Sequence, residues 1–230
     1  MRDKTWFKNI FIENDFLIDD NKLSLLEKYC DLLISKNQVV NLISPNSEKN
    51  IWEEHILHSL SFLLKVKLKR KSYILDLGTG GGLPGIPLKI LFPDIKMVLI
   101  DSTQKKMIAV KEIINSLGIT GIEIFTGRAE ELKSENKLNG KFDYVISRAV
   151  GKLDKILEWG LPFLKKSSTK TNDNIPTRSI LVLKGGNITD ELNIVKKNKK
   201  LFNLDVINIT FKGCENLFNP DKKLIIMYPK

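Results

Sequence analysis

A glycine-rich turn between a short apolar run and a helix is the feature that most restricts how this sequence can fold. Tyr73–Leu77 form the apolar run, and Gly78, Gly80 and Gly82 follow it before a helix that we expect to begin at Pro84. Glycines allow the backbone to approach a ligand closely, and the first turn of a helix offers unpaired N–H groups. In an open parallel sheet, this arrangement predicts a nucleoside pocket at the carboxyl ends of the strands.

After residue 72 the sequence alternates short apolar runs with segments of helix length, a pattern typical of βαβ units. We therefore predict an α/β fold with a doubly wound, mostly parallel, Rossmann-like sheet that ends in an antiparallel hairpin. The predicted strands are Tyr73–Leu77, Met97–Asp101, Ile122–Phe125, Phe142–Ser147 and Ile180–Leu183, and the hairpin comprises Leu204–Phe211 and Lys223–Tyr228. The predicted helices are Pro84–Leu91, Gln104–Leu117 and Leu153–Leu161, and residues 165–178 are a predicted surface loop.

The length of 230 residues suits one main domain with a small appendage. We place the appendage, a helical extension, at residues 1–70 and the α/β domain at residues 71–230. We find no run of about 18 apolar residues that would cross a bilayer. The N-terminal residues lack the apolar core and cleavage site of a signal peptide, so we expect a cytoplasmic protein without a membrane partner.

Two helices are expected in the extension. Apolar residues at steps of three and four indicate an amphipathic helix at Lys22–Lys36, capped by Asp19 or Asp20. A second helix is expected to begin after Pro45, with Ser47 as its cap.

The composition favours a polyanionic partner and argues against a metal. The net charge of +10 suits phosphates, since Lys and Arg side chains that neutralise them release counterions; a general bias toward Lys, Asn and Ile is the alternative explanation. Cys30 and Cys214 lie far apart, and His55 and His58 lack a third ligand. We predict neither a disulfide nor a metal site.

Two classes of cofactor fit the glycine pattern, because Gly80, Gly82 and Gly85 also match the dinucleotide fingerprint. Asp76 favours S-adenosylmethionine, since a carboxylate at the strand end attracts the ammonium group of the methionine part and repels a pyrophosphate. Asp101 ends the second predicted strand, where it would accept hydrogen bonds from the ribose hydroxyls of either cofactor. We predict S-adenosylmethionine in a class I methyltransferase fold.

The third and fourth predicted strands are followed by further candidates. Glu130 and the backbone N–H groups near Ala129 are placed to contact adenine, although a helix-capping role for Glu130 fits equally well. Arg148 lies where the methyl group and its acceptor should meet, and its guanidinium suits a cofactor carboxylate or an RNA phosphate. A solvated arginine at a strand end is the alternative.

Several motifs make the sequence resemble the bacterial 16S ribosomal RNA guanine-N7 methyltransferases, the family called glucose-inhibited division protein B. The motifs are Asn41-Leu42, His55-Ile56-Leu57, Asp76 to Gly80 with Leu83-Pro84-Gly85-Ile86-Pro87, Leu99 to Ser102, Arg128-Ala129-Glu130, Ser147-Arg148-Ala149 and Leu183-Lys184-Gly185. They span most of the chain. Two features depart from the family: His58 stands where an aspartate is usual, and the loop at residues 165–178 is longer than typical.

The resemblance implies an enzyme that methylates N7 of a guanine in the 530 loop of 16S ribosomal RNA. It also implies that Gly78, Leu83, Ala129, Glu130 and Arg148 contact the cofactor, with Asp101 beside the ribose. Together with the glycine-rich turn, the predicted cofactor site comprises Asp76, Gly78, Gly80, Gly82, Leu83, Asp101, Ala129, Glu130 and Arg148.

The chemistry of guanine N7 demands little of the side chains. This nitrogen has an in-plane lone pair and no proton, so positioning does most of the catalysis and no general base is needed. We expect Arg148 to act catalytically by positioning the reactants. The sequence also lacks the Asn/Asp-Pro-Pro-Tyr/Phe tetrapeptide and the Pro-Cys or Thr-Cys pair of other nucleic-acid methyltransferases.

The predicted RNA contacts are a basic run before the first strand and a lysine after the fifth. Five cations in seven residues suit a phosphate backbone, although a solvated linker fits the same pattern. The expected partner is 16S ribosomal RNA or the small ribosomal subunit, bound by a monomer. The predicted RNA-binding residues are Lys65, Lys67, Lys69, Arg70, Lys71 and Lys184.

Two other functions remain open on the sequence alone. A small-molecule methyltransferase would bind the same cofactor and act at a rate indifferent to RNA. An NAD-dependent dehydrogenase or a non-catalytic nucleotide-binding module would bind NAD more tightly than S-adenosylhomocysteine; Asp76 and the lack of a hydride-transfer His/Asp pair argue against it.

Overall fold

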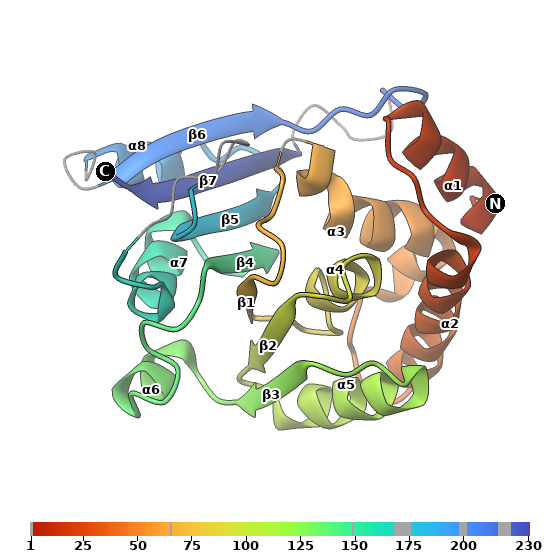
Figure 1. Cartoon of the computed structure of the whole chain (residues 1–230), viewed down its shortest axis with the longest axis horizontal. Helices are drawn as coiled ribbons and strands as arrows, with labels where there is room; N and C mark the ends of the chain where they lie inside the picture. The colour runs from red at the N-terminus through yellow and green to blue at the C-terminus, as the bar shows by residue number, and fades with distance from the viewer. Residues whose placement is uncertain (1, 65, 149, 168–175, 198–201, 216–221) are drawn as a thin grey trace.

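A seven-stranded sheet with helices on both faces forms the centre of the protein (Figure 1). The computed structural model describes residues 2–64, 66–148, 150–167, 176–197, 202–215 and 222–230. The strands are β1 (Tyr73–Leu77), β2 (Lys96–Asp101), β3 (Ile122–Thr126), β4 (Tyr144–Arg148), β5 (Ser179–Lys184), β6 (Phe202–Asn208) and β7 (Lys223–Pro229). Their order across the sheet is β3-β2-β1-β4-β5-β7-β6.

The five strands from β3 to β5 are parallel, and β7 pairs antiparallel with both β5 and β6. The predicted fold class and the C-terminal hairpin are therefore confirmed. The chain leaves β1 toward β2 on one side and returns as β4 on the other, so the order of strands reverses at β1. Ligands bind at such a switch point, outside the carboxyl ends of the strands.

The helices divide into two layers, as Figure 1 shows. One layer contains α1 (Lys4–Glu13), α2 (Asp20–Asn37), α4 (Gly85–Leu91), α5 (Gln104–Leu117) and the segment 45–64; the other contains α6 (Ala129–Ser134), α7 (Leu153–Gly160) and α8 (Thr189–Lys197). The helix predicted at Lys22–Lys36 is confirmed, and Asp19 caps it by accepting from the backbone N–H of Lys22 at 2.8 Å. Neither α1 nor α8 was predicted individually from the sequence.

The second helix predicted in the extension is wrong as a regular α-helix. The segment is a 3-10 helix η1 (Pro45–Asn50), a π-helix η2 (Ile51–Leu57), a short α3 (His58–Leu60) and a 3-10 turn η3 (Ser61–Leu64). Ser47 does not cap it, because its hydroxyl donates to the carbonyl of Ser44 at 2.7 Å and contacts His55. The carbonyls of Glu54 and His55 accept from Arg148. π-Helical turns are frequently found at functional sites.

Each face of the sheet has its own hydrophobic cluster. Residues 1–70 contribute large buried side chains to the cluster that also contains Ile74, Leu99 and Ile146 of the sheet. The boundary that we predicted at residue 70 therefore runs through one hydrophobic cluster. The second cluster lies under α6, α7 and α8. The large side chains that the N-terminal segment buries most fully are Phe7, Leu26, Tyr29, Leu33, Ile56, Leu57, Leu60 and Phe62.

In the described part of the chain, no helix is both long enough and apolar enough to cross a membrane. Within the same residues, no three His, Cys, Asp or Glu side chains gather in a way that would hold a metal ion. Cys30 and Cys214 are buried free thiols, and burial raises the pKa of each.

Candidate active site

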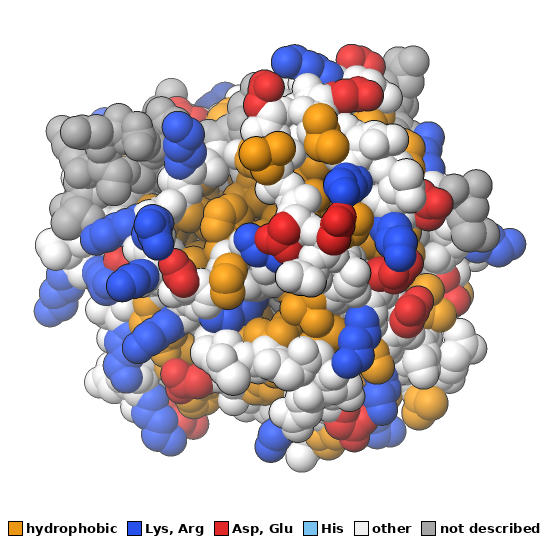
Figure 2. Space-filling model, turned by 45° about the vertical axis from the view of Figure 1, so that its right-hand side comes forward, with side chains coloured by type: hydrophobic (Ala, Val, Ile, Leu, Met, Phe, Trp, Pro, Cys, Tyr) orange, Lys and Arg blue, Asp and Glu red, His pale blue; other side chains and the backbone are white. Residues whose placement is uncertain are grey.

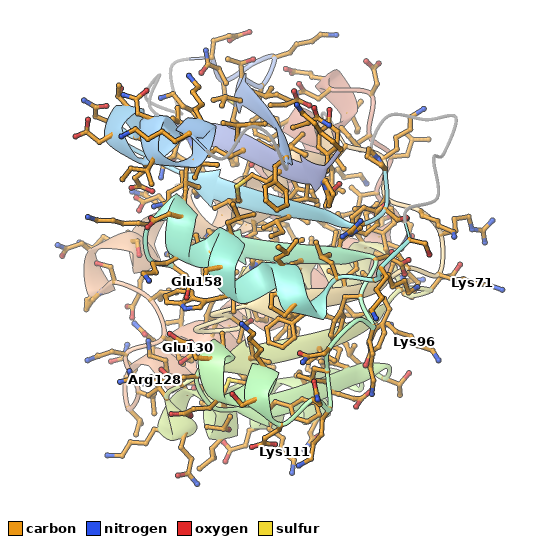
Figure 3. The ribbon with its side chains drawn as sticks, turned by 90° about the vertical axis from the view of Figure 1, so that its left-hand side faces the viewer. Lys71, Lys96, Lys111, Arg128, Glu130 and Glu158 are labelled. Carbon is orange, nitrogen blue, oxygen red and sulfur yellow. The ribbon has the colours of Figure 1, made fainter. Side chains whose placement is uncertain are left out.

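A cavity of about 270 Å³ opens at the carboxyl ends of β1, β2 and β3, where the strand order reverses. In Figure 3, Arg128 and Glu130 lie at this end of the sheet, and Lys71 and Lys96 lie at the opposite end. The cavity is lined by Leu77, Gly78, Ile100, Asp101, Ser102, Gly127, Arg128, Ala129, Glu130, Val150 and Trp159. Four predicted cofactor residues, Gly78, Asp101, Ala129 and Glu130, thus line one cavity.

Asp101 is fixed in place by two backbone groups. Its Oδ2 accepts from the N–H of Gly80 at 3.0 Å, and its Oδ1 accepts from the N–H of Thr103 at 2.9 Å. Each carboxylate oxygen retains a further lone pair, so the group can still accept hydrogen bonds from a ligand in the cavity. The arrangement joins the glycine-rich turn to the end of β2.

Asp76 lies beneath the glycine-rich turn and does not line the cavity. It is fully buried, and its Oδ2 accepts from the hydroxyl of Thr79 at 2.7 Å and from the N–H of Gly85 at 2.9 Å. Its Oδ1 has no hydrogen-bond partner among the described residues. Burial raises the pKa of Asp76 to about 7, against the lowering effect of the Thr79 and Gly85 hydrogen bonds. In this structure Asp76 holds the turn; its contact with an ammonium group stays a prediction.

Three further predicted residues of the glycine-rich turn, Gly80, Gly82 and Leu83, also lie outside the cavity lining. A β-carbon at Gly82 would lie 2.4 Å from Cδ1 of Ile86, so this glycine lets the turn pack on α4. Leu83 is buried in the cluster beneath. Gly80 contributes the N–H that Asp101 accepts.

Trp159 and Val150 form walls of the cavity that the sequence analysis did not predict. Trp159 comes from α7, and a β-carbon at Gly151 would lie 3.2 Å from its ring. Arg128, the first residue of the quoted motif Arg128-Ala129-Glu130, and Gly127 before it were also missed.

Arg148 points away from this cavity. Its Nη1 donates to the carbonyls of Glu54 and His55 and to the hydroxyl of Ser59, at 3.2–3.3 Å. Its Nη2 lies 2.6 Å from Nδ1 of His55. Burial lowers the pKa of Arg148 to about 10, which leaves the guanidinium charged at neutral pH.

The predicted RNA contacts occupy two different places. Lys67, Lys69, Arg70 and Lys71 are exposed next to the amino end of β1, opposite the cavity, and Lys65 lies outside the described residues. Arg70 pairs with Asp94 at 3.1 Å. The other predicted contact, Lys184, is the last residue of β5 and lies at the edge of the sheet that carries the cavity. It donates to the carbonyl of Gly151 at 2.7 Å and pairs with Glu191.

The comparison with known protein families identifies the family of this chain. Residues 22–219 match the GidB family model, described as rRNA small subunit methyltransferase G. The chain belongs to this family. Its predicted resemblance to the family is therefore confirmed. The enzyme of that name from Alkaliphilus metalliredigens is 38% identical over 165 residues, which are 72% of this chain and 69% of the relative.

Two other members of the family are similar over longer spans. The protein from Clostridium novyi is 36% identical over 190 residues, covering 82% of this chain and 74% of its own. The protein from Pelodictyon phaeoclathratiforme is 38% identical over 188 residues, covering 82% and 76%.

Solved structures of low sequence identity share the family's fold. A predicted O-methyltransferase from Agrobacterium tumefaciens has a TM-score of 0.57 at 15% identity and covers 76% of this chain and 80% of its own. Aeropyrum pernix fibrillarin with natively bound S-adenosyl-L-methionine has a TM-score of 0.52 at 14% identity, covering 73% and 72%. These similarities establish the class I methyltransferase architecture of the sheet.

Proposed function

We propose that this chain transfers a methyl group from S-adenosylmethionine to N7 of a guanine in 16S ribosomal RNA. The observation that carries the proposal is the cavity walled by Gly78, Asp101 and Ala129 at the carboxyl edge of the sheet, in a member of the rRNA small subunit methyltransferase G family. The family's name supplies the class of substrate. Guanine N7 and the 530 loop follow from the sequence resemblance.

The residues that line the cavity suit the adenosine part of the cofactor. Asp101 would accept from the ribose hydroxyls, and Ala129 and Glu130 would face the adenine ring. Val150 and Trp159 offer apolar walls for that ring. The volume of about 270 Å³ is close to the roughly 300 Å³ of the smaller ligand pockets.

The side chains have a positioning task in this reaction. S-adenosylmethionine, when bound, supplies an activated methyl group on a positively charged sulfur. Guanine N7 attacks with a lone pair and has no proton to lose, so no residue of the chain has to act as a base. The apolar walls exclude water, and holding the two reactants in line accounts for most of the acceleration.

RNA would approach the edge of the sheet at which the cavity opens. Lys105, Arg128 and Lys152 are exposed at this edge, because each stands at or before the start of a helix that follows a parallel strand. These cations attract phosphates, in keeping with the net charge of +10. Figure 2 shows another face of the molecule, where Lys and Arg side chains also gather toward the left of the view.

The decisive experiment supplies tritium-labelled S-adenosylmethionine and small ribosomal subunits from cells that lack this modification. We expect label in 16S RNA and N7-methylguanine on mass spectrometry of its digest. Subunits that already carry the modification are the matched control and should accept none. No incorporation into unmodified subunits or free 16S RNA would overturn the proposal.

A further inference from the structure

Arg148 is a half-buried cation, and its guanidinium has only neutral hydrogen-bond partners among the described residues. Its guanidinium donates to two carbonyls, to the hydroxyl of Ser59 and to the ring of His55. Among the described residues, it forms no ion pair with a carboxylate within 4.0 Å. Charges that are partly removed from water are usually paired, so an arginine in this position suits an anionic group that a ligand brings.

The hydrogen bond from Arg148 determines which ring nitrogen of His55 carries the proton. A guanidinium has no acceptor, so Nδ1 of His55 must accept from Arg148 with its lone pair. The proton of the ring is then on Nε2, which lies 2.6 Å from Oγ of Ser47, and Ser47 in turn donates to the carbonyl of Ser44. Burial lowers the pKa of His55 to about 3, with the charge of Arg148 as the second cause, so the ring is neutral at physiological pH.

The same layer of the protein rests on the glycine-rich turn. The hydroxyl of Tyr29 donates to the carbonyl of Gly81 at 3.0 Å, and the carbonyl of Leu42 lies 3.8 Å from where a β-carbon at Gly80 would be. The backbone N–H of Leu42 is held by Oδ1 of Asn37. Through Ser47 and the carbonyl of Ser44, His55 connects Arg148 to the chain just after Leu42, and Leu42 packs on this turn.

Arg148 lies on the turn's side of β4. Tyr144 and Ile146 alternate with Val145 between the two hydrophobic clusters, and residue 148 continues the series on the side of the N-terminal helices. β4 pairs with β1, whose last residues lead into Gly78. The guanidinium is thus beside the turn, on the other side of β4 from the adenosine cavity.

We propose that His55 is a positioning residue, whose Nδ1 lone pair holds the Arg148 guanidinium where it pairs with the carboxylate of the cofactor's methionine part. The inference rests on S-adenosylmethionine as the cofactor of the proposed function. Arginine has many side-chain conformations, and a fixed acceptor removes the entropic cost of ordering it when the ligand binds.

Two variants separate the two hydrogen bonds of the ring. In His55→Asn, the amide oxygen stands one bond beyond Cγ, as Nδ1 does, and keeps an acceptor for Arg148. In His55→Gln, the amide nitrogen stands two bonds beyond Cγ, as Nε2 does, and keeps a donor for Ser47. Ser47→Ala is the matched third variant, because it removes the far bond and leaves the ring in place.

The experiment measures binding of two ligands by calorimetry. S-adenosylhomocysteine carries the amino-acid carboxylate, and 5′-methylthioadenosine carries the same adenosine and sulfur without it. We expect His55→Gln to weaken the binding of S-adenosylhomocysteine about tenfold, because a hydrogen bond to a charged group is lost. The affinity for methylthioadenosine should stay within about twofold of wild type. His55→Asn and Ser47→Ala should change both ligands by less than about threefold.

The contrary outcomes are distinct. Equal weakening of both ligands in His55→Gln would assign His55 a structural role, as would an Asn variant no better than the Gln variant. Unchanged binding in His55→Gln would mean that Arg148 needs no support from His55. Melting temperatures of the three variants identify any general loss of folding. Failure of the wild-type chain to methylate 16S RNA while it binds S-adenosylhomocysteine would overturn the substrate and leave this inference intact.

Discussion

Cγ2 of Val150 lies 2.3 Å from the position that a β-carbon would occupy on Gly78. The two residues follow the ends of β4 and β1, and both line the cavity. Gly78 also has a φ of +71°, a left-handed conformation that favours glycine. The lack of a side chain at residue 78 therefore allows the two loops to meet and to form one wall of the site.

Gly78→Ala should disrupt the wall and with it the binding of the cofactor. The added methyl group has to displace Val150 and also adopts a backbone conformation that costs about 1–2 kcal/mol. We expect S-adenosylhomocysteine to bind at least about tenfold more weakly by calorimetry, on the scale of core overpacking. Gly118→Ala is the matched control: residue 118 has a φ of +66° and no atom within 4 Å of its β-carbon position, so it should lose stability without losing affinity.

Asp101→Ala should weaken cofactor binding for two reasons. The variant loses the acceptor for the ribose hydroxyls, and it also frees the N–H of Gly80 that the carboxylate holds. Hydrogen bonds to a charged group contribute about 1.5–3 kcal/mol, so we expect the dissociation constant of S-adenosylhomocysteine to rise about 10- to 100-fold. An unchanged constant in a variant of normal melting temperature would place the ribose elsewhere.

The sheet was predictable from sequence because its signals are local. The run at residues 73–77 and the helix at Gln104–Leu117 have the predicted bounds, since a buried parallel strand needs a continuous apolar run and an amphipathic helix a regular spacing. Asp101, Ala129 and Glu130 could be placed for the same reason. Asp101 is the last residue of β2, Ala129 and Glu130 come within four residues of the end of β3, and the carboxyl ends of parallel strands meet at one edge.

Other parts depend on contacts between distant residues and could not be predicted. The π-helix at Ile51–Leu57 is held by Arg148, which is more than ninety positions away in the sequence. No local pattern reports such a partner. Trp159 and Val150 were missed for a similar reason: their neighbours in the cavity, Gly78 and Gly127, come from other strands.

Asp76→Asn should change how stability depends on pH. The pKa of Asp76 is raised from 3.8 to about 7, first by burial. Between these pH values the folded chain keeps a proton that the unfolded chain releases, so the wild-type free energy of unfolding falls as pH rises through this window. The Asn side chain does not ionise, and its carbonyl can still accept from Thr79 and Gly85.

We therefore expect the stability of the Asn variant, relative to wild type, to grow by about 1.4 kcal/mol for each pH unit across the window. Urea unfolding at several pH values measures the difference. His55 and His58 have lowered pKa values, chiefly through burial, and act in the opposite direction, but they are common to both proteins. A constant difference from pH 4 to 7 would mean that Asp76 is already ionised at pH 4.

Charge at the two ends of the sheet should affect RNA binding differently. One variant replaces Lys105, Arg128 and Lys152 by glutamine at the edge that carries the cavity, and the other replaces three exposed lysines of the basic run at residues 67–71. β1 alone separates the two ends by about 17 Å, at roughly 3.3 Å for each of its five residues. Phosphates beside a guanine docked at the cavity should meet the first set.

We expect the variant at the cavity edge to bind 16S RNA more weakly and to reduce the slope of log affinity against log salt by about 0.7–0.9 for each lost phosphate contact. The variant of the basic run should keep most of the affinity and slope, because its side chains face the opposite end. Filter binding from low to moderate salt measures both. A larger loss of slope in the variant of residues 67–71 would instead mean that the RNA wraps around the amino end, as the sequence pattern first indicated.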